Sequence, residues 1–143
     1  KRQIYMMEEI NEEECKILKK LTNNYKTQIV IQEFLPDIYD GDFRVLIIHG
    51  EPYTKTLARI PQGDSFKGNL AAGGKGEVRD ISEVQMRIGS VVGEYLMKKD
   101  INFAGIDIIG QKLTEINITS PTCAREIFEQ SGMNPIEDYF KKL

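Results

Sequence analysis

A chain of 143 residues is long enough to form one compact domain with its own hydrophobic core. Its formal net charge is −3, and 29% charged with 41% hydrophobic residues is the composition of an ordinary globular protein. This balance argues against a nucleic-acid-binding protein and against a membrane-surface protein, because either would need a concentrated basic face. The sequence contains no run of about 18 apolar residues, so no membrane-spanning helix is expected.

The chain begins with Lys1 rather than methionine, and we expect it to be a piece of a longer protein. Its two cysteines, Cys15 and Cys123, are far apart in the sequence and form no Cys-x-x-Cys motif. The sequence therefore predicts neither a disulfide framework nor a zinc site, and we expect reduced thiols in a cytoplasmic protein.

The first part of the chain alternates predicted strands with one predicted helix. Asn11, followed three residues later by Glu14, resembles a capping box and predicts a helix over about 12–22. Pro36 ends one β-branched run, and His49-Gly50 between two others predicts a hairpin. The strands predicted in this part lie at 4–7, 28–35, 43–49 and 52–60.

The second part of the chain begins with a predicted loop. Residues 61–77 contain five glycines and show no periodicity, which is typical of a binding loop or lid. Ser82 and Gln85 then form a second capping box. The elements predicted beyond it are a helix to about residue 99, strands at 102–110 and 113–119, and helices at 122–132 and after Asn134. This order predicts an α+β domain with a mainly antiparallel sheet and flanking helices.

Polar residues on the last two predicted strands point to a metal site. Glu115 and Asn117 share one face of their strand, because side chains alternate along a strand. A three-residue loop at 110–112 would place Asp107 opposite Glu115, whereas a two-residue loop would place it opposite Thr114. Two facing carboxylates repel unless a cation lies between them, and hard oxygen ligands suit Mg²⁺. The alternative is a solvated sheet face from which acidic residues simply point outward.

The glycine-rich loop resembles a Walker A motif but does not match it. The stretch from Gly68 to Lys75 contains one glycine too many, and Gly76 stands where Ser or Thr is required. The glycines would still let backbone N–H groups approach an anion, and Lys67 would add positive charge. A flexible surface loop is the alternative.

Two arginines, Arg44 and Arg59, lie inside apolar strands of the same predicted hairpin. Each needs a partner there, and a phosphate or carboxylate held by two hydrogen bonds is one possibility. The alternative is a structural ion pair with Glu33, Asp40 or Asp42.

Four strings carry a family resemblance, over about residues 29–126: "QEFLPDIYDGDFRVLII", "LARIPQGDSFKGNLAAGG", "GIDIIG" and "TEINITSPT". In this order they are similar to the bacterial glutathione synthetase family of ATP-grasp ligases. Such enzymes join a carboxylate to an amine through an acyl phosphate made from ATP, and this branch adds glycine to γ-glutamylcysteine. The resemblance implies that residues 1–143 are the C-terminal part of an ATP-grasp domain, with the N-terminal domain and most of the central domain absent.

The resemblance also implies roles for individual residues. Arg59 would stabilise the transferring phosphoryl group and the tetrahedral intermediate, and the loop at 60–77 would close over the acyl phosphate and exclude water. The implied ligands of Mg²⁺, with Mn²⁺ as the alternative, are Asp107, Glu115 and Asn117. The implied ATP contacts are Gln32, Glu33, Phe34, Leu35 and Asp42. The implied substrate contacts are Arg44, Lys67, Gly68, Asn69, Ser120 and Thr122.

The partners implied in this way are ATP, γ-glutamylcysteine and glycine, in a homo-oligomeric full-length enzyme that binds neither nucleic acid nor membrane. We expect the chain alone to be inactive or nearly so. Two alternatives stay open: another ATP-grasp ligase that joins a different carboxylate to a different amine, and a non-catalytic nucleotide-binding module.

Overall fold

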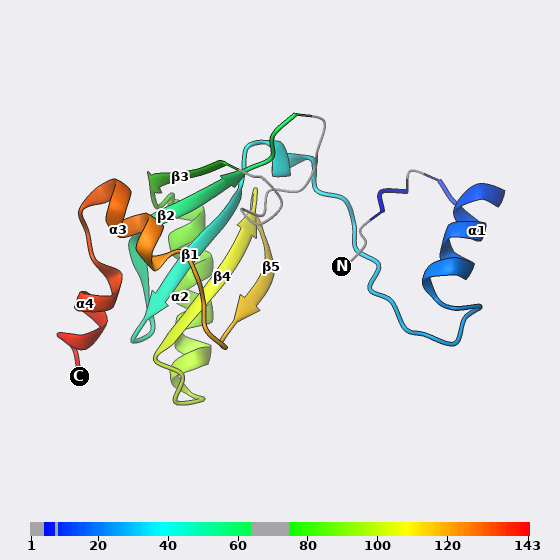
Figure 1. Cartoon of the computed structure of the whole chain (residues 1–143). Coiled ribbons are helices and arrows are strands. Elements are labelled where there is room, and N and C mark those ends of the chain that lie inside the picture. The colour runs from blue at the N-terminus through cyan, green and yellow to red at the C-terminus, as the bar shows by residue number, and fades with distance from the viewer. Residues whose placement is uncertain (1–4, 8, 64–74) are drawn as a thin grey trace. The chain divides into compact units, whose positions relative to one another are not determined.

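The computed structural model describes residues 5–7, 9–63 and 75–143 (Figure 1). The chain divides into two compact units, Lys1–Phe34 and Leu35–Leu143, and each is considered by itself. Among the described residues, no helix is long and apolar enough to cross a membrane.

The smaller unit contains one helix, α1 (Glu12–Leu21). Asn11 begins it as predicted: its Oδ1 accepts hydrogen bonds from the backbone N–H of Glu13 (2.8 Å) and Glu14 (3.3 Å), and the Glu14 carboxylate accepts one from the Asn11 N–H. No residue of α1 is buried.

The two strands predicted for this part of the chain are wrong. Residues 5–7 and 28–35 form no strand, and Val30 and Ile31 are 84% and 77% exposed. Their β-branched side chains favour an extended backbone, but a strand also needs a neighbour for its N–H and C=O groups. The sheet of the described chain includes neither segment.

The larger unit is built on one five-stranded antiparallel sheet in the order β3-β2-β1-β4-β5 (Figure 1). Its strands are β1 (Asp42–Ile48), β2 (Glu51–Ile60), β3 (Lys75–Asp80), β4 (Phe103–Ile109) and β5 (Lys112–Asn117). A short 3-10 helix, η1 (Pro36–Tyr39), precedes β1. The turn between β1 and β2 is the predicted one, with positive φ at both His49 (48°) and Gly50 (82°). The predicted α+β class and mainly antiparallel sheet are confirmed.

Strand β3 was not predicted, because its residues lie partly within the loop expected at 61–77. Lys75 pairs with Ile60, and Gly76 with Arg59, so the strand begins while the sequence still looks like loop. Three consecutive residues that are charged or glycine give no alternation from which to recognise a strand. Residues 64–74, the rest of that loop, lie outside the described residues.

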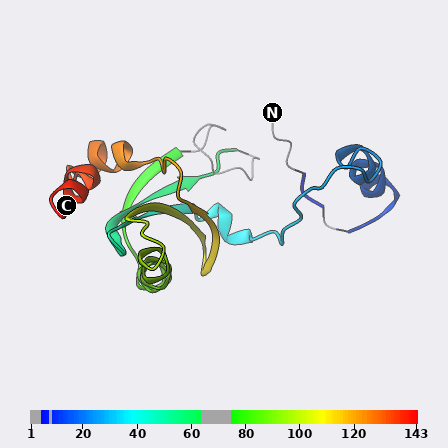
Figure 2. The same ribbon diagram turned by 90° about the horizontal axis from the view of Figure 1, so that it is seen from below.

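Helix α2 (Glu83–Met97) packs on one face of the sheet, inside its curve (Figure 2). Its start at Ser82 is confirmed, since the Ser82 hydroxyl accepts from the Gln85 N–H at 3.2 Å. Gly93 allows a very close approach to the β1–β2 turn: a Cβ at this position would overlap the carbonyl oxygen of Gly50. The apolar core on this face comprises Val45, Ile47, Val92, Leu96, Ala104, Ile106 and Ile108.

Helices α3 (Ala124–Ser131) and α4 (Pro135–Phe140) pack against a second apolar core. The capping of α4 is confirmed, since Asn134 Oδ1 accepts from the backbone N–H of Ile136 and Glu137 at 3.2 Å each. The buried residues of this core are Leu46, Ile48, Tyr53, Leu57, Cys123 and Ile127. Leu46 and Ile48 alternate along β1 with the residues of the α2 core, so the two cores lie on opposite faces.

The face that carries Leu46 changes character along the strands. Towards the start of β1, the residues that share its alternation are Asp42 and Arg44, and their sheet partners are Arg59 and Asp107. One end of this face is therefore an apolar core, and the other end holds buried charges.

Candidate functional site

The β4–β5 hairpin places the two predicted carboxylates opposite each other, but not by the expected loop. Ile109 pairs with Lys112, so the turn has two residues rather than three. A bulge at Thr114 then shifts the register by one, and Asp107 lies opposite Glu115. The Thr114 hydroxyl donates to the Asp107 carbonyl oxygen at 3.1 Å. Of the two pairings considered from sequence, the structure has Asp107 opposite Glu115, although it reaches this pairing by a two-residue turn and a bulge rather than by a three-residue loop.

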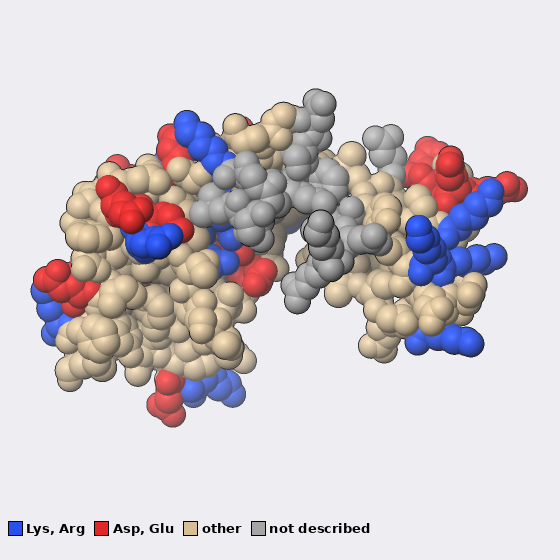
Figure 3. Space-filling view, viewed as in Figure 1, with Lys and Arg blue, Asp and Glu red and all other residues tan. Residues whose placement is uncertain are grey.

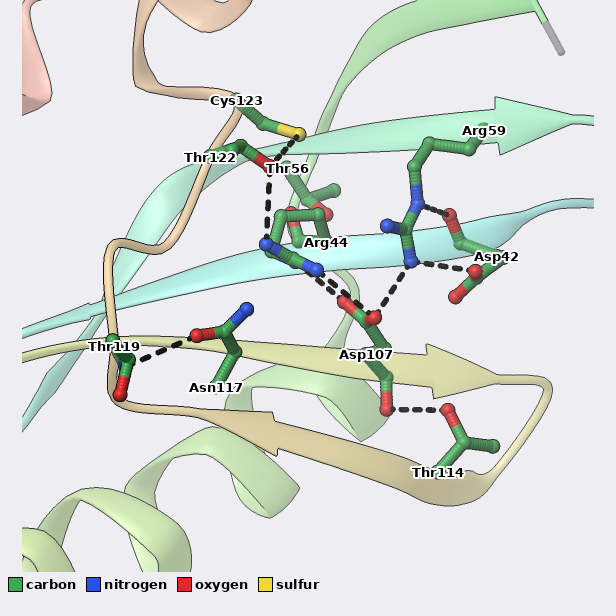
Figure 4. Close-up of polar contacts among 10 residues, drawn as sticks. All are labelled: Asp42, Arg44, Thr56, Arg59, Asp107, Thr114, Asn117, Thr119, Thr122 and Cys123. Carbon is green, nitrogen blue, oxygen red and sulfur yellow. Dashed lines mark hydrogen bonds and ion pairs between the residues drawn. The ribbon is translucent and has the colours of Figure 1, made fainter. Parts of the chain in front are cut away.

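Arg44 and Asp107 form a buried ion pair with two hydrogen bonds (Figure 4). Arg44 Nε lies 2.5 Å from Asp107 Oδ1, and Nη2 lies 3.0 Å from Oδ2. The two residues are 4% and 5% exposed. They meet because they are directly opposite in the β1–β4 ladder. This partner differs from Glu33, Asp40 and Asp42, which the sequence analysis suggested as ion-pair partners.

Arg59 joins the same group of charges. Its Nη2 lies 2.5 Å from Asp42 Oδ2 and 2.9 Å from Asp107 Oδ2, and its Nε donates to the Asp42 carbonyl oxygen at 3.3 Å. The ion pair between Arg59 and Asp42 is one of those expected from sequence. We call Asp42, Arg44, Arg59 and Asp107 the charge network.

Burial sets the electrostatics of the charge network. It raises the pKa of Asp42, and the neighbouring charge of Asp107 raises it further, while Arg59 lowers it without cancelling the rise. Burial opposes the charge on Arg59, but the two carboxylates outweigh it and hold the Arg59 pKa above its usual value. Asp42 Oδ1 is buried and has no hydrogen-bond partner among the described residues. The network thus keeps a firmly cationic guanidinium beside a carboxylate with unused acceptor capacity.

The segment after β5 brings one predicted substrate contact to this network. Thr122 Oγ1 lies 3.4 Å from Arg44 Nη1, and both Thr122 and Ser120 are exposed residues. Ser120 and Cys123 both have left-handed backbones, with φ of 54° and 87°. Non-glycine residues in this conformation are uncommon and occur often at binding sites, which makes the turn a candidate for ligand contact.

Gly105 is a site residue that the sequence analysis missed. A Cβ there would lie 2.9 Å from Arg44 Cδ and 3.0 Å from Pro121 Cβ, so only glycine leaves room for both. The available signal was a glycine inside an apolar strand, which often marks a close approach of another group.

The three predicted metal ligands share the face of the charge network. Asn117 pairs with Gly105 in the ladder, two residues along from the Asp107–Glu115 pair. Its Oδ1 accepts a hydrogen bond from the Thr119 N–H at 3.1 Å. No group of three or more His, Cys, Asp or Glu residues in the described part of the chain could hold a metal ion, so a site here needs the amide oxygen. Two carboxylates and one amide are hard oxygen donors, and as a donor set they fit Mg²⁺ or Mn²⁺.

The remaining predicted site residues are spread along the chain. Of the expected ATP contacts, only Asp42 lies in the charge network; Gln32, Glu33 and Phe34 belong to the smaller unit, and Leu35 begins the larger one. Lys67, Gly68 and Asn69 lie outside the described residues. On the face of the larger unit drawn in Figure 3, basic and acidic side chains lie beside one another.

Comparison with known proteins gives one family and one fold. The model of the family described as prokaryotic glutathione synthetase, ATP-grasp domain, matches residues 2–132. A glutathione synthetase of Xanthomonas campestris is 50% identical over 118 residues, which cover 82% of this chain and 37% of that protein. One of Vibrio parahaemolyticus is 51% identical over 111 residues, or 78% of this chain and 35% of that protein. The chain thus spans little more than a third of these relatives.

Among solved structures, the ATP-grasp ligase PsnB, complexed with a precursor peptide and AMPPNP, is similar to this chain with a TM-score of 0.50. The identity is 17%, and the match covers 78% of this chain and 34% of that one. At this identity the likeness shows a shared fold, the ATP-grasp fold, and nothing about substrates.

Proposed function

Because this chain belongs to the prokaryotic glutathione synthetase family through its ATP-grasp domain, we propose that it serves an ATP-dependent ligase that joins γ-glutamylcysteine to glycine. The products would be glutathione, ADP and phosphate. One observation of the structure carries the proposal: in a largely buried network of two arginines and two aspartates, one aspartate, Asp107, lies opposite a third carboxylate, Glu115. The chain covers 37% of its Xanthomonas relative, so we assign residues 1–143 to the C-terminal part of the ATP-grasp domain.

The proposed metal ligands are Asp107, Glu115 and Asn117. Mg²⁺ or Mn²⁺ bound there would neutralise charge on the phosphate oxygens during transfer. Asp107 is buried and fixed by its arginine partners, whereas Glu115 is exposed on the edge strand β5. The site would therefore combine one rigid ligand with one that can move towards an arriving ion.

The two arginines would bind and stabilise negative charge on the substrates. We assign to Arg59 the stabilisation of the transferring phosphoryl group, since its guanidinium stays cationic in a buried site where a charge is weakly screened. Arg44 and Thr122, which lie within 3.4 Å of each other, would hold a substrate carboxylate, with Ser120 and residues 67–69 completing the peptide contacts. Asp42 and the segment 32–35 would contact the nucleotide.

No general base is evident among the described residues of this site. Glycine would attack the acyl phosphate as its neutral amine once both are held in place and water is kept out, and the departing phosphate would take the proton that the new amide nitrogen loses. The residues present supply positioning and charge, which matches what such a reaction needs.

The test is an assay of ADP formation by the longest native protein that contains this chain, with γ-glutamylcysteine and glycine. We expect ADP and glutathione in equal amounts, and only when both substrates are present. Turnover with a different acid and amine would instead support another ATP-grasp ligase, and nucleotide binding without any turnover would support a non-catalytic module.

Two variants connect this assay to the metal site. Asn117→Ala should lower turnover and raise the Mg²⁺ concentration needed for half-maximal rate, with the fold intact. Glu51→Gln, which removes an exposed carboxylate at the β1–β2 turn, serves as the control. An unchanged metal requirement in Asn117→Ala would remove that residue from the site.

We also propose a cytoplasmic location, which is consistent with two free cysteines. The homo-oligomeric state expected from the resemblance stays a prediction.

A further inference from the structure

Asp107 has little capacity left for a metal ion. A carboxylate offers about four acceptor positions on its two oxygens. Arg44 takes one on each oxygen, at 2.5 and 3.0 Å. Arg59 Nη2 lies 2.9 Å from Oδ2 as an ion pair but makes no hydrogen bond among the described residues. One position is left on each oxygen, and a cation at the one on Oδ2 would lie beside the Arg59 guanidinium.

The charge of these partners matters more than their number. Groups that hold a metal ligand in place usually raise metal affinity, because they orient the ligand and accept its proton. Here both partners are cations, and a cation beside the carboxylate repels the incoming metal. Arg44 is 4% exposed, so solvent and salt screen this repulsion weakly.

Arg44 is also unable to swing away when a cation arrives. Its strand position opposite Asp107 is fixed by the β1–β4 ladder, and the Thr56 hydroxyl donates to its carbonyl oxygen at 2.8 Å. Its side chain runs through the space left by Gly105, beside Pro121. The cationic partner therefore stays at Asp107 whether or not the site is filled.

We propose that Arg44 is a positioning residue that sets the divalent-cation affinity of this site: it keeps Asp107 neutralised, so that a bare cation binds weakly. This inference depends on the metal site of the proposed function. Its consequence is that appreciable binding requires additional negative charge, such as the phosphates of a nucleotide. A site of this kind does not fill with metal in the absence of its co-substrate.

Titration of the 143-residue chain with Mn²⁺ alone, with free Mn²⁺ measured by electron paramagnetic resonance, tests the proposal without any activity readout. Arg44→Gln should bind Mn²⁺ at least about tenfold more tightly than the wild type, since one unit charge is removed from a buried ion pair. Adding Asp107→Asn to that variant should abolish the gain. The matched control is Lys55→Gln, which removes one positive charge at an ion pair with exposed Asp80, and its affinity should equal that of the wild type.

The possible failures are distinguishable. If Arg44→Gln binds Mn²⁺ as weakly as the wild type while Glu115→Gln weakens binding further, the metal site stands and this inference is wrong. If neither Glu115→Gln nor Asp107→Asn changes Mn²⁺ binding, the metal site itself is wrong, and the inference fails with it. Should Arg44→Gln not fold, Arg44→Lys keeps the positive charge while losing the two-bond contact. Its Mn²⁺ affinity should then stay close to that of the wild type, and binding as tight as that expected for Arg44→Gln would overturn the proposal, because the charge would not be what sets the affinity.

Discussion

Gly105 decides whether Arg44 can reach Asp107. Replacing it with alanine puts a methyl group 2.9 Å from Arg44 Cδ and 3.0 Å from the rigid ring of Pro121. Since the proline ring cannot yield, we expect Arg44 to be displaced and the unfolding free energy to fall by about 1–3 kcal/mol, the usual cost of overpacking. Urea denaturation measures the loss. A variant as stable as the wild type would show that Arg44 has room that the structure does not indicate.

At the residue scale, sequence reasoning found the charged residues but paired only some of them. Asp42 and Arg59 lie at the two ends of one hairpin, so their contact follows from local spacing. Arg44 and Asp107 meet only because β1 lies beside β4, and residues 63 positions apart carry no local signal of this. The Thr114 bulge is equally hidden, because one extra residue leaves the alternation of Glu115 and Asn117 unchanged.

Among the elements, α3 secures the outer edge of β3 through one side chain. Gln130 accepts from the Val78 N–H at 2.9 Å and donates to the Gly76 carbonyl oxygen at 3.3 Å, as a neighbouring strand would. Gln130→Leu should therefore lower the unfolding free energy by about 1 kcal/mol and speed hydrogen exchange at the Val78 amide. Nuclear magnetic resonance measures the exchange. Glu129→Ala, in the same helix and exposed, is the control, and equal exchange rates in both variants would contradict the role of Gln130.

A second contact between elements, from β2 to α4, should make stability depend on pH. The Tyr53 hydroxyl donates to Asp138 Oδ2 at 2.8 Å, and burial first, then this bond, raises the Tyr53 pKa above 10.0. Above pH 10 an unfolded tyrosine loses its proton while the folded one keeps it, so the unfolding free energy should fall as pH rises.

Comparing the unfolding free energy of wild type and Tyr53→Phe at pH 8 and pH 11 measures this dependence. We expect the wild type to lose more stability over this interval than the variant, which has no hydroxyl to ionise. Tyr95→Phe, at an exposed tyrosine, is the control and should behave as the wild type does. Equal losses in wild type and Tyr53→Phe would show that the Tyr53 pKa is not raised.

The sequence patterns predicted some strands correctly, missed one and predicted others that do not exist. The strands that alternate or bury their residues, β1, β2 and β4, were found nearly at their true bounds. Strand β3 was missed because its pattern is charged and glycine-containing, yet β2 offers it a partner. The segment 28–35 was wrongly predicted because it has strand residues but is not one of the strands of the sheet in the described chain. Partner availability is a tertiary property, and local propensity does not contain it.

For the whole molecule, the two units differ in the interactions that stabilise each unit internally. Both apolar cores belong to Leu35–Leu143, whereas α1 in the smaller unit buries no residue. A segment of 34 residues with a 10-residue helix is below the size at which a chain usually folds alone. Sequence composition predicted one domain, because composition is averaged over the chain and cannot reveal where the core residues lie.

Removing residues 1–34 should therefore leave the fold of the larger unit intact. We expect the shortened chain, Leu35–Leu143, to keep its strand signal in circular dichroism and to melt within about 2 °C of the intact chain, since no core residue is lost. The matched control removes residues 133–143 instead, which deletes α4 and with it the stacking of Tyr139 on His49 at 4.7 Å and the Tyr53–Asp138 hydrogen bond. That truncation is smaller but should lower the Tm by several degrees, roughly 4–8 °C for each 1 kcal/mol lost from a domain of this size. A large fall in Tm on removing 1–34, or no fall on removing 133–143, would show that the residues that stabilise the chain are not those of the two apolar cores and their contacts.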